Sequence, residues 1–136
     1  MAMVGGCYCG ALRYAAEGEA VFKGQCHCRE CQYISGGSPN VAMGMPEAGF
    51  RYTRGTPKQF RRTDIEHAAT RDFCGECGTH IITRSPHVPG VVILKVGTLD
   101  DPKVYEGPQS AIFTVDMQPW HHVPPGVPAF ERTPPQ

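Results

Sequence analysis

Short apolar stretches alternate with turn-forming residues along most of this chain, a pattern typical of β-strands joined by tight turns. Val91–Leu94 is the one continuous apolar run, so we expect it to form a central strand buried on both faces. One short helix is expected after Cys28, because Arg29–Ser35 contains neither Gly nor Pro. Alternating, β-branched or aromatic segments predict eight strands: Ala11–Ala15, Ala20–Gly24, Asn40–Met43, Phe50–Thr53, Gln59–Arg62, His80–Thr83, Val91–Val96 and Ala111–Val115.

The composition supports a turn-rich β fold. Among 136 residues there are 16 Gly and 13 Pro, which favours many turns and disfavours long helices. After Trp120 the chain becomes rich in proline, which lacks the amide donor that a strand ladder needs. We therefore predict one mostly β domain over residues 4–122 and a Pro-rich C-terminal arm over residues 123–136, with Phe130 as a possible anchor.

Charge and hydropathy exclude several classes of function. The 13 basic residues are balanced by 13 acidic ones, which argues against nucleic-acid binding as the function. No segment approaches the roughly 20 apolar residues needed to cross a bilayer, and the first residues lack the features of a signal peptide. We therefore expect no membrane association and a cytoplasmic, reducing location, where clustered cysteines are thiols or metal ligands rather than disulfides.

Seven cysteines fall into three tight groups: Cys7 and Cys9; Cys26, Cys28 and Cys31; and Cys74 and Cys77. One-residue and two-residue gaps let a single turn present two sulfurs to one zinc ion. Residues two apart on a regular strand lie about 7 Å from each other, so the backbone must bend at Cys7 and Cys9. Flanking glycines permit such bends here and around Cys74 and Cys77.

The pairing of the groups has two solutions. Cys7 and Cys9 can join Cys74 and Cys77, or they can join two of the middle three cysteines. The first solution leaves no orphan thiol and is favoured. It places four thiolates on one closed structural zinc and leaves Cys26, Cys28 and Cys31 for a second ion. Three protein ligands keep one position for a substrate, and three thiolates make zinc a poor activator of water but suit it to binding another thiolate.

Other interpretations of the cysteines stay open. A histidine can complete a closed structural site at the middle group, with His27, His67 and His80 as candidates, although His27 is expected to face away from the metal. Cys31 can instead act as a low-pKa nucleophile without metal. A redox role is the alternative for Cys74 and Cys77, but no βαβ pattern surrounds them.

The cysteine motifs resemble those of the glutathione-dependent formaldehyde-activating enzyme (GFA) family, which also includes centromere protein V. The resemblance covers nearly all of residues 5–122 and rests on these segments: Gly6-Cys7-x-Cys9-Gly10 with Tyr14, Cys26-His27-Cys28-x-x-Cys31, Phe73-Cys74-x-x-Cys77-Gly78-Thr79, Gly97-Thr98-Leu99-Asp100-Asp101-Pro102 and Pro119-Trp120. It implies several small, strongly curved antiparallel sheets around zinc-binding loops. It also implies a structural zinc on Cys7, Cys9, Cys74 and Cys77, and a labile, catalytic zinc on Cys26, Cys28 and Cys31.

The family reaction adds glutathione to formaldehyde and is classed as a carbon–sulfur lyase. We therefore predict an enzyme whose second zinc binds glutathione or a similar small thiol for addition to an aldehyde, or for the reverse step. Glutathione carries two carboxylates, so arginine partners are expected, Arg29 first and then Arg51 and Arg84. Trp120 is expected to anchor the arm or to wall a pocket. The alternative is a non-catalytic zinc module that binds a protein or a nucleic acid, and a homodimer is also possible.

Overall fold

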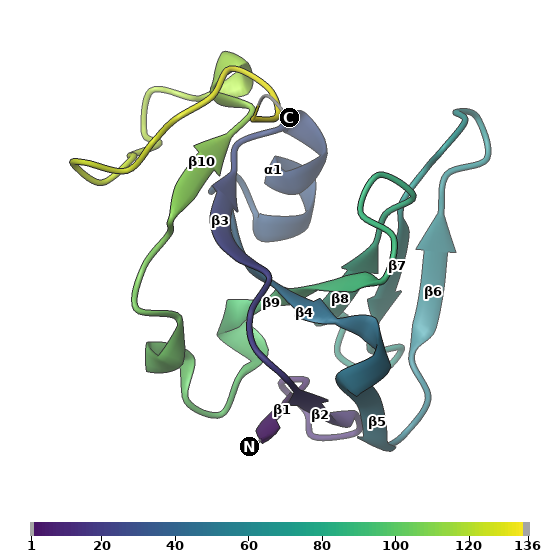
Figure 1. The fold of residues 1–136 in the computed structure, drawn as a ribbon. Coiled ribbons are helices and arrows are strands. Elements are labelled where there is room, and N and C mark those ends of the chain that lie inside the picture. Colours follow the sequence, from purple (N-terminus) through teal and green to yellow (C-terminus); the bar gives the residue numbers. More distant parts are fainter. Residues whose placement is uncertain (1, 135–136) are drawn as a thin grey trace.

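The computed structural model describes residues 2–134 of the chain, and these fold into a mostly β structure, as the sequence predicts (Figure 1). The only α-helix of this part is α1, and four short 3₁₀ helices lie at Glu47–Gly49, Val96–Thr98, Pro102–Tyr105 and Thr114–Asp116. The ten strands are β1 (Ala2–Gly6), β2 (Arg13–Glu17), β3 (Phe22–Cys26), β4 (Asn40–Pro46), β5 (Phe50–Arg54), β6 (Lys58–Arg61), β7 (Thr70–Phe73), β8 (His80–Arg84), β9 (Val91–Lys95) and β10 (Ser110–Ile112).

The strands form two sheets. The larger has the order β10-β3-β4-β9-β8-β7-β6, and the smaller has the order β1-β2-β5. All pairs are antiparallel except β3 and β10, which run parallel. β9, which contains the apolar run Val91–Leu94, lies fourth of seven in the larger sheet. The predicted central strand is therefore central in the structure.

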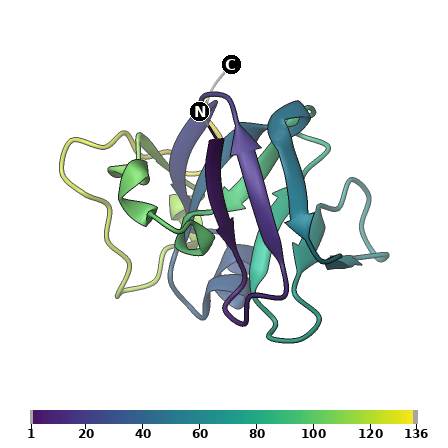
Figure 2. The same cartoon turned by 90° about the horizontal axis from the view of Figure 1, so that it is seen from below.

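The core lies between the small sheet and one face of the large sheet. In Figure 2 the purple strands β1 and β2 lie across the larger sheet. Met43 pairs with Leu94, and Leu94 pairs with Ile82, so these three side chains share one face. All three are at most 2% exposed and belong to one apolar cluster with Tyr14 of β2. Burial of this face fixes the register, because a one-residue slip would turn it to solvent.

Helix α1 (Arg29–Ser35) lies against β4, on the other side of the large sheet from β1, β2 and β5 (Figure 1). Its bounds are those predicted from the absence of Gly and Pro. Cys28 is the N-cap residue, and its Sγ accepts a hydrogen bond from the Cys31 N–H at 3.3 Å. Gly36 ends the helix in the left-handed region at φ 79°, where a side chain would be strained.

The C-terminal segment lies along β10, as the yellow chain beside β10 in Figure 1 shows. Ala111 N–H donates to the Pro128 carbonyl at 2.9 Å, and Phe130 N–H donates to the Ala111 carbonyl at 2.9 Å. The predicted arm over residues 123–136 therefore docks by its backbone, and its last two residues, Pro135 and Gln136, lie outside the described part. The domain boundary near residue 122 stays a prediction. In the described chain, no helix combines the length and apolar character that crossing a membrane requires.

Candidate metal centres and active-site cleft

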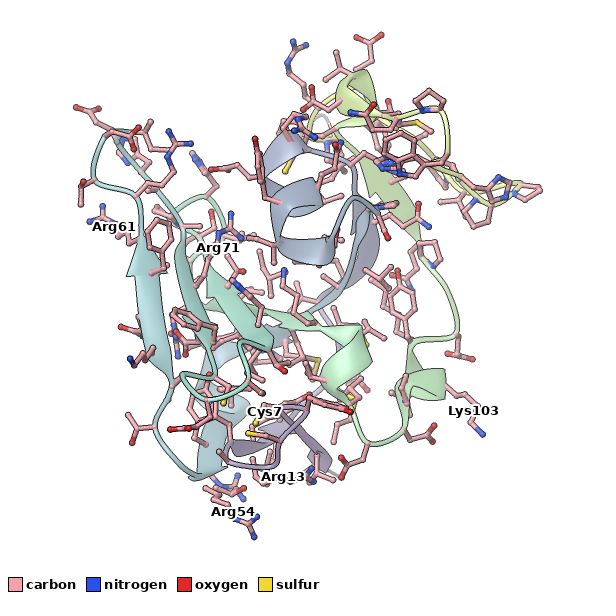
Figure 3. All side chains as sticks on the ribbon, turned by 180° about the vertical axis from the view of Figure 1, so that it is seen from behind. Cys7, Arg13, Arg54, Arg61, Arg71 and Lys103 are labelled. Carbon is pink, nitrogen blue, oxygen red and sulfur yellow. The ribbon has the colours of Figure 1, made fainter. Side chains whose placement is uncertain are left out.

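Four cysteines from two distant parts of the chain meet beside the core. The sulfurs of Cys7, Cys9, Cys74 and Cys77 all lie within 4.8 Å of one another. Cys7 and Cys9 follow β1, whereas Cys74 and Cys77 stand in the turn between β7 and β8. The structure thus joins the first and last cysteine groups of the sequence, the pairing that leaves no orphan thiol; Cys7 is labelled in Figure 3.

The geometry of this group fits zinc. Tetrahedral zinc with sulfur bonds of about 2.3 Å requires sulfurs about 3.8 Å apart. The Sγ atoms of Cys7 and Cys9 are 3.7 Å apart, and those of Cys9 and Cys74 are 3.8 Å apart. The Leu12 N–H donates to Cys7 Sγ at 3.2 Å, and two amides of the following turn donate to Cys74 Sγ at 3.3 and 3.4 Å. Such donors stabilise thiolate ligands.

The local backbone bends as this site requires. Gly10 and Gly78 follow Cys9 and Cys77 with φ angles of 83° and 80°, in the left-handed region that glycine adopts without strain. The Thr79 hydroxyl lies 3.2 Å from Cys77 Sγ, and hydrogen bonds from Thr79 lower the pKa of Cys77 to about 5. Cys77 is therefore a thiolate at neutral pH, the form that binds metal.

The other three cysteines form a second group at the junction of β3 and α1. Cys26 is the last residue of β3, Cys28 is the N-cap residue of α1, and Cys31 lies buried in the first turn of the helix. Their sulfurs all lie within 4.8 Å of one another. A strand end followed at once by a helix start thus presents three sulfurs to one point.

The three thiols shift one another's pKa values. Hydrogen bonds from Cys26 and then Cys31 lower the pKa of Cys28 to about 2. Hydrogen bonding with Cys28 and Cys31 raises the pKa of Cys26, because Cys26 serves as the donor. A divalent cation that displaces the thiol protons would gain three thiolate ligands at this point. This donor set also suits zinc.

In the part of the chain that the structure describes, no histidine or carboxylate joins the three sulfurs. His27 is fully buried, but its Nδ1 lies 2.9 Å from Nδ1 of His121 and its Nε2 lies 3.2 Å from Oε1 of Gln25. It faces away from the cysteines, as the sequence predicts. His67 is exposed, and the ring of His80 stacks on Phe73 with a centroid distance of 5.7 Å.

A cleft of about 310 Å³ lies between α1 and the β6–β7 side of the large sheet. Arg71 points from β7 toward α1 in Figure 3, and its Nη2 lies 3.8 Å from the Glu30 carboxylate of the helix. Arg71 Nη1 also donates to the Thr83 hydroxyl at 3.3 Å. The lining residues are Glu30, Tyr33, Ile34, Phe60, Arg62, Ala68, Ala69, Arg71 and His80. None of the three cysteines lines the cleft, but Arg71 links it to them, because its charge helps to lower the pKa of Cys28.

Lys95 is a second cation near this group and was missed in the sequence analysis. It is 9% exposed, its Nζ makes no hydrogen bond within the described residues, and its charge interacts with those of Cys31 and Arg71. Burial lowers the pKa of Lys95 to about 8, so it is mostly protonated at pH 7. The signal that could have found it is a lysine that directly follows the apolar run of the central strand.

The arginines predicted to bind a substrate are not among the lining residues of the cleft, although Arg29 contacts Tyr33, which is. Arg29 is exposed, donates to Gln32 and stacks over Tyr33 with its guanidinium 5.0 Å from the ring centre. Arg51 forms an exposed ion pair with Glu17 at 3.6 Å. The substrate-binding role of Arg29 stays a prediction. Trp120 is 67% exposed and donates from Nε1 to the Gly37 carbonyl at 2.9 Å, which ties the start of the C-terminal segment to the end of α1.

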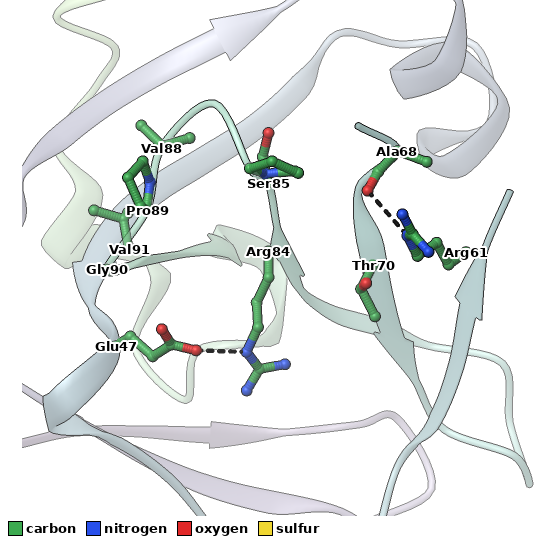
Figure 4. Close-up of a pocket in the computed structure, with 11 residues that line it drawn as sticks. Glu47, Arg61, Ala68, Thr70, Arg84, Ser85, Val88, Pro89, Gly90 and Val91 are labelled. Carbon is green, nitrogen blue, oxygen red and sulfur yellow. Dashed lines mark hydrogen bonds and ion pairs between the residues drawn. The ribbon is translucent and has the colours of Figure 1, made fainter. Parts of the chain in front are cut away.

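A second pocket of about 320 Å³ shares only Ala68 with the lining of the cleft. Figure 4 shows Arg84 on one side of it, donating to Glu47 at 2.8 Å, and Arg61 on the other, donating to the Ala68 carbonyl at 3.5 Å. Arg84 also donates to the buried carboxylate of Asp72 at 3.1 Å. None of the seven cysteines lines this pocket. Arg84 is already neutralised by Glu47 and Asp72, so we assign it no catalytic role.

The model of one protein family, the glutathione-dependent formaldehyde-activating enzyme, matches residues 2–116. This match contains all seven cysteines and most of the chain. The chain belongs to the GFA family. The resemblance inferred from the cysteine motifs is thereby confirmed.

This GFA protein also shares its fold with a crystal structure of a Rhodobacter sphaeroides protein, a structural genomics target. The TM-score is 0.61 at 19% sequence identity, and the similarity covers 94% of this chain and 99% of the other. At this level of identity the likeness concerns the fold alone. No curated protein matches the chain at a significant level.

Proposed function

We propose that this GFA protein is a zinc-dependent enzyme of the carbon–sulfur lyase type. It binds glutathione or a similar small thiol at Cys26, Cys28 and Cys31 and adds it to formaldehyde or a related electrophile, or releases it. The observation that supports this proposal is the convergence of three sulfurs beside a cleft. In the described chain no fourth protein ligand joins them. The group of Cys7, Cys9, Cys74 and Cys77 has the complete ligand set of a structural zinc site.

Zinc held by the three cysteines would supply a site for an external thiol and lower the pKa of that thiol. The chain's own residues hold and orient the reactants. The cleft brings the thiol and the aldehyde together, which lowers the entropic part of the barrier. In the reaction the thiol releases its proton to solvent and its sulfur forms a bond to the carbonyl carbon. The π electron pair of the carbonyl moves to oxygen, and this oxygen takes a proton from solvent.

Arg71 is the best candidate in the cleft to bind a substrate carboxylate. Its side chain is 13% exposed and its contact with Glu30 is long, at 3.8 Å. The Glu30 carboxylate is 51% exposed, so the pair is weak and a substrate carboxylate can replace it. Arg62 also lines the cleft, and its Nη2 pairs with Asp64 at 2.7 Å. Arg62 also pairs with Glu30 at 3.7 Å, so two carboxylates already engage it and Arg71 is the candidate that we retain.

Calorimetric titration of the zinc-loaded protein with glutathione tests the proposal. We expect saturable binding to the wild type and no binding to a Cys28→Ser variant that keeps its four-cysteine zinc. Serine is a good N-cap residue, so this variant should keep α1. Cysteamine, which lacks carboxylates, should bind more weakly than glutathione. If a protein with both groups loaded binds no small thiol, the enzyme proposal is wrong and a non-catalytic zinc module is favoured.

A further inference from the structure

Strand register places Lys95 on the same face of the large sheet as the three-cysteine group. Lys95 pairs with Ala42 of β4, and Ala42 pairs with Gly24 of β3. Residues directly opposite each other in a sheet point to the same face, and so do residues two apart on one strand. Cys26 lies two residues after Gly24, so Lys95 and Cys26 share this face. It is the face away from the Met43–Leu94 core, and α1 packs against it through β4.

The ammonium group of Lys95 has no acceptor within the described chain. Its Nζ is buried and makes no hydrogen bond, including to the three sulfurs. Burying a charged group without partners is costly, and unpaired buried lysines are rare. Methionine would fill the same space in the sheet without that cost. The three free N–H donors therefore indicate a ligand atom as the missing acceptor, between the strand and the cysteines.

The neighbouring polar groups do not replace Lys95 in this role. Arg71 already donates to Thr83 and faces Glu30. Burial, together with the charges of Lys95 and Arg71, lowers the pKa of His80, so this ring is neutral at pH 7. Among the described residues around the cysteines, Lys95 is thus the one buried cation that makes no hydrogen bond.

We propose that Lys95 is the anion-binding group of the three-cysteine site and holds the substrate oxygen that gains negative charge when a thiolate adds to a carbonyl. This inference rests on the proposed function. The sulfur forms a bond to the carbonyl carbon, and the π electron pair moves to oxygen. The ammonium donates a hydrogen bond to this oxygen throughout, and solvent supplies the proton that neutralises it. A fixed cation in a water-poor site stabilises such charge more than water does.

Two small thiols that differ in charge test this assignment at equilibrium. Mercaptoacetate carries a negative oxygen one carbon further from its sulfur than the adduct does, and 2-mercaptoacetamide is its neutral analogue. Calorimetry on the zinc-loaded wild type should show about 10- to 100-fold tighter binding of mercaptoacetate, the range for a charge-assisted hydrogen bond. Lys95→Met should lose this preference, with unchanged zinc content and unchanged affinity for the amide. The exposed-site control Lys103→Met should keep it.

The outcomes separate the two proposals. Equal affinity of the wild type for both thiols, or a preference that survives in Lys95→Met, overturns the role of Lys95 and leaves the thiol site standing. If Arg71→Met loses the preference for mercaptoacetate and Lys95→Met keeps it, Arg71 binds the carboxylate and the role of Lys95 is likewise overturned. Binding of neither thiol refutes the proposed function and this inference with it. If Lys95→Met does not fold, Lys95→Gln carries the same expectation.

Discussion

Replacing one cysteine in each group should have very different effects on the stability of the protein. Cys74 is 2% exposed and lies in the main apolar cluster with Cys7, where Cys77 packs against it. Structural zinc contributes on the order of 10 kcal/mol in small zinc domains, whereas whole domains are stable by about 5–15 kcal/mol. The free energy lost with this site is therefore comparable to the total free energy of unfolding. We therefore expect Cys74→Ser to be unfolded or aggregated.

Cys28→Ser removes the same atom from the other group, but the local structure tolerates it. Cys28 lies outside the main apolar cluster and serves as the N-cap of α1. A serine hydroxyl at this position accepts the same amide hydrogen bond, and serine is among the best N-cap residues. With the three-cysteine group stripped of metal in both proteins, we expect Cys28→Ser and the wild type to unfold within about 1 kcal/mol of each other.

Zinc content by mass spectrometry and guanidinium unfolding followed by far-UV circular dichroism measure both effects. The wild type should bind two zinc ions per chain, of which a mild chelator removes one. Cys28→Ser should retain one ion and a cooperative transition. The same substitution chemistry in both variants makes each the control of the other. Equal collapse of the two variants, or a folded Cys74→Ser with wild-type stability, would refute the division of labour between the groups.

Two further predictions concern buried polar groups. Asp72 is 1% exposed and accepts hydrogen bonds from Tyr52 and Arg84. Asp72→Ala should therefore lower the free energy of unfolding in urea by about 3 kcal/mol. The control Glu17→Ala, which breaks an exposed ion pair, should lower it by less than about 1 kcal/mol. Burial lowers the pKa of His80, so this imidazole binds a proton more readily in the unfolded chain than in the folded protein. The free energy of unfolding should therefore fall as pH drops below about 6.5. His80→Gln should reduce that fall between about pH 7.5 and 5.5.

The pattern of apolar residues predicted most strands because side chains alternate across a sheet with one buried face. β1 and β7 were missed for a physical reason. Ala2–Gly6 ends in two glycines, which are not typical of strands. In Thr70–Phe73 the buried position is held by Asp72, whose hydrogen bonds compensate for its burial, so the segment lacks an apolar pattern. The segment expected as the strand Ala11–Ala15 begins at Arg13, since residues 11 and 12 complete the turn after Cys9. Local sequence does not encode these long-range partners.

The cysteine groups could be predicted because each lies within a few residues of sequence, and their spacing limits the ions that they can bind. The cations beside them could not. Arg71 and Lys95 come from β7 and β9, and only the pairing of strands brings them to the face that carries Cys26. An anchor for the C-terminal segment was expected at Phe130, but its partner β10 was not predicted, because proline content says little about the carbonyl groups that accept from a neighbouring strand.

The separation in sequence of the two cysteine groups has a consequence for the order in which the protein matures. The trio spans only residues 26–31, whereas Cys9 and Cys74, whose sulfurs are 3.8 Å apart, are 65 positions apart. Closing the longer loop carries the larger entropic cost and needs β7 and β8 to be synthesised first. A chain emerging from the ribosome can therefore bind an ion at the trio early, whereas the four-cysteine group is completed only after Cys74 and Cys77 have been synthesised.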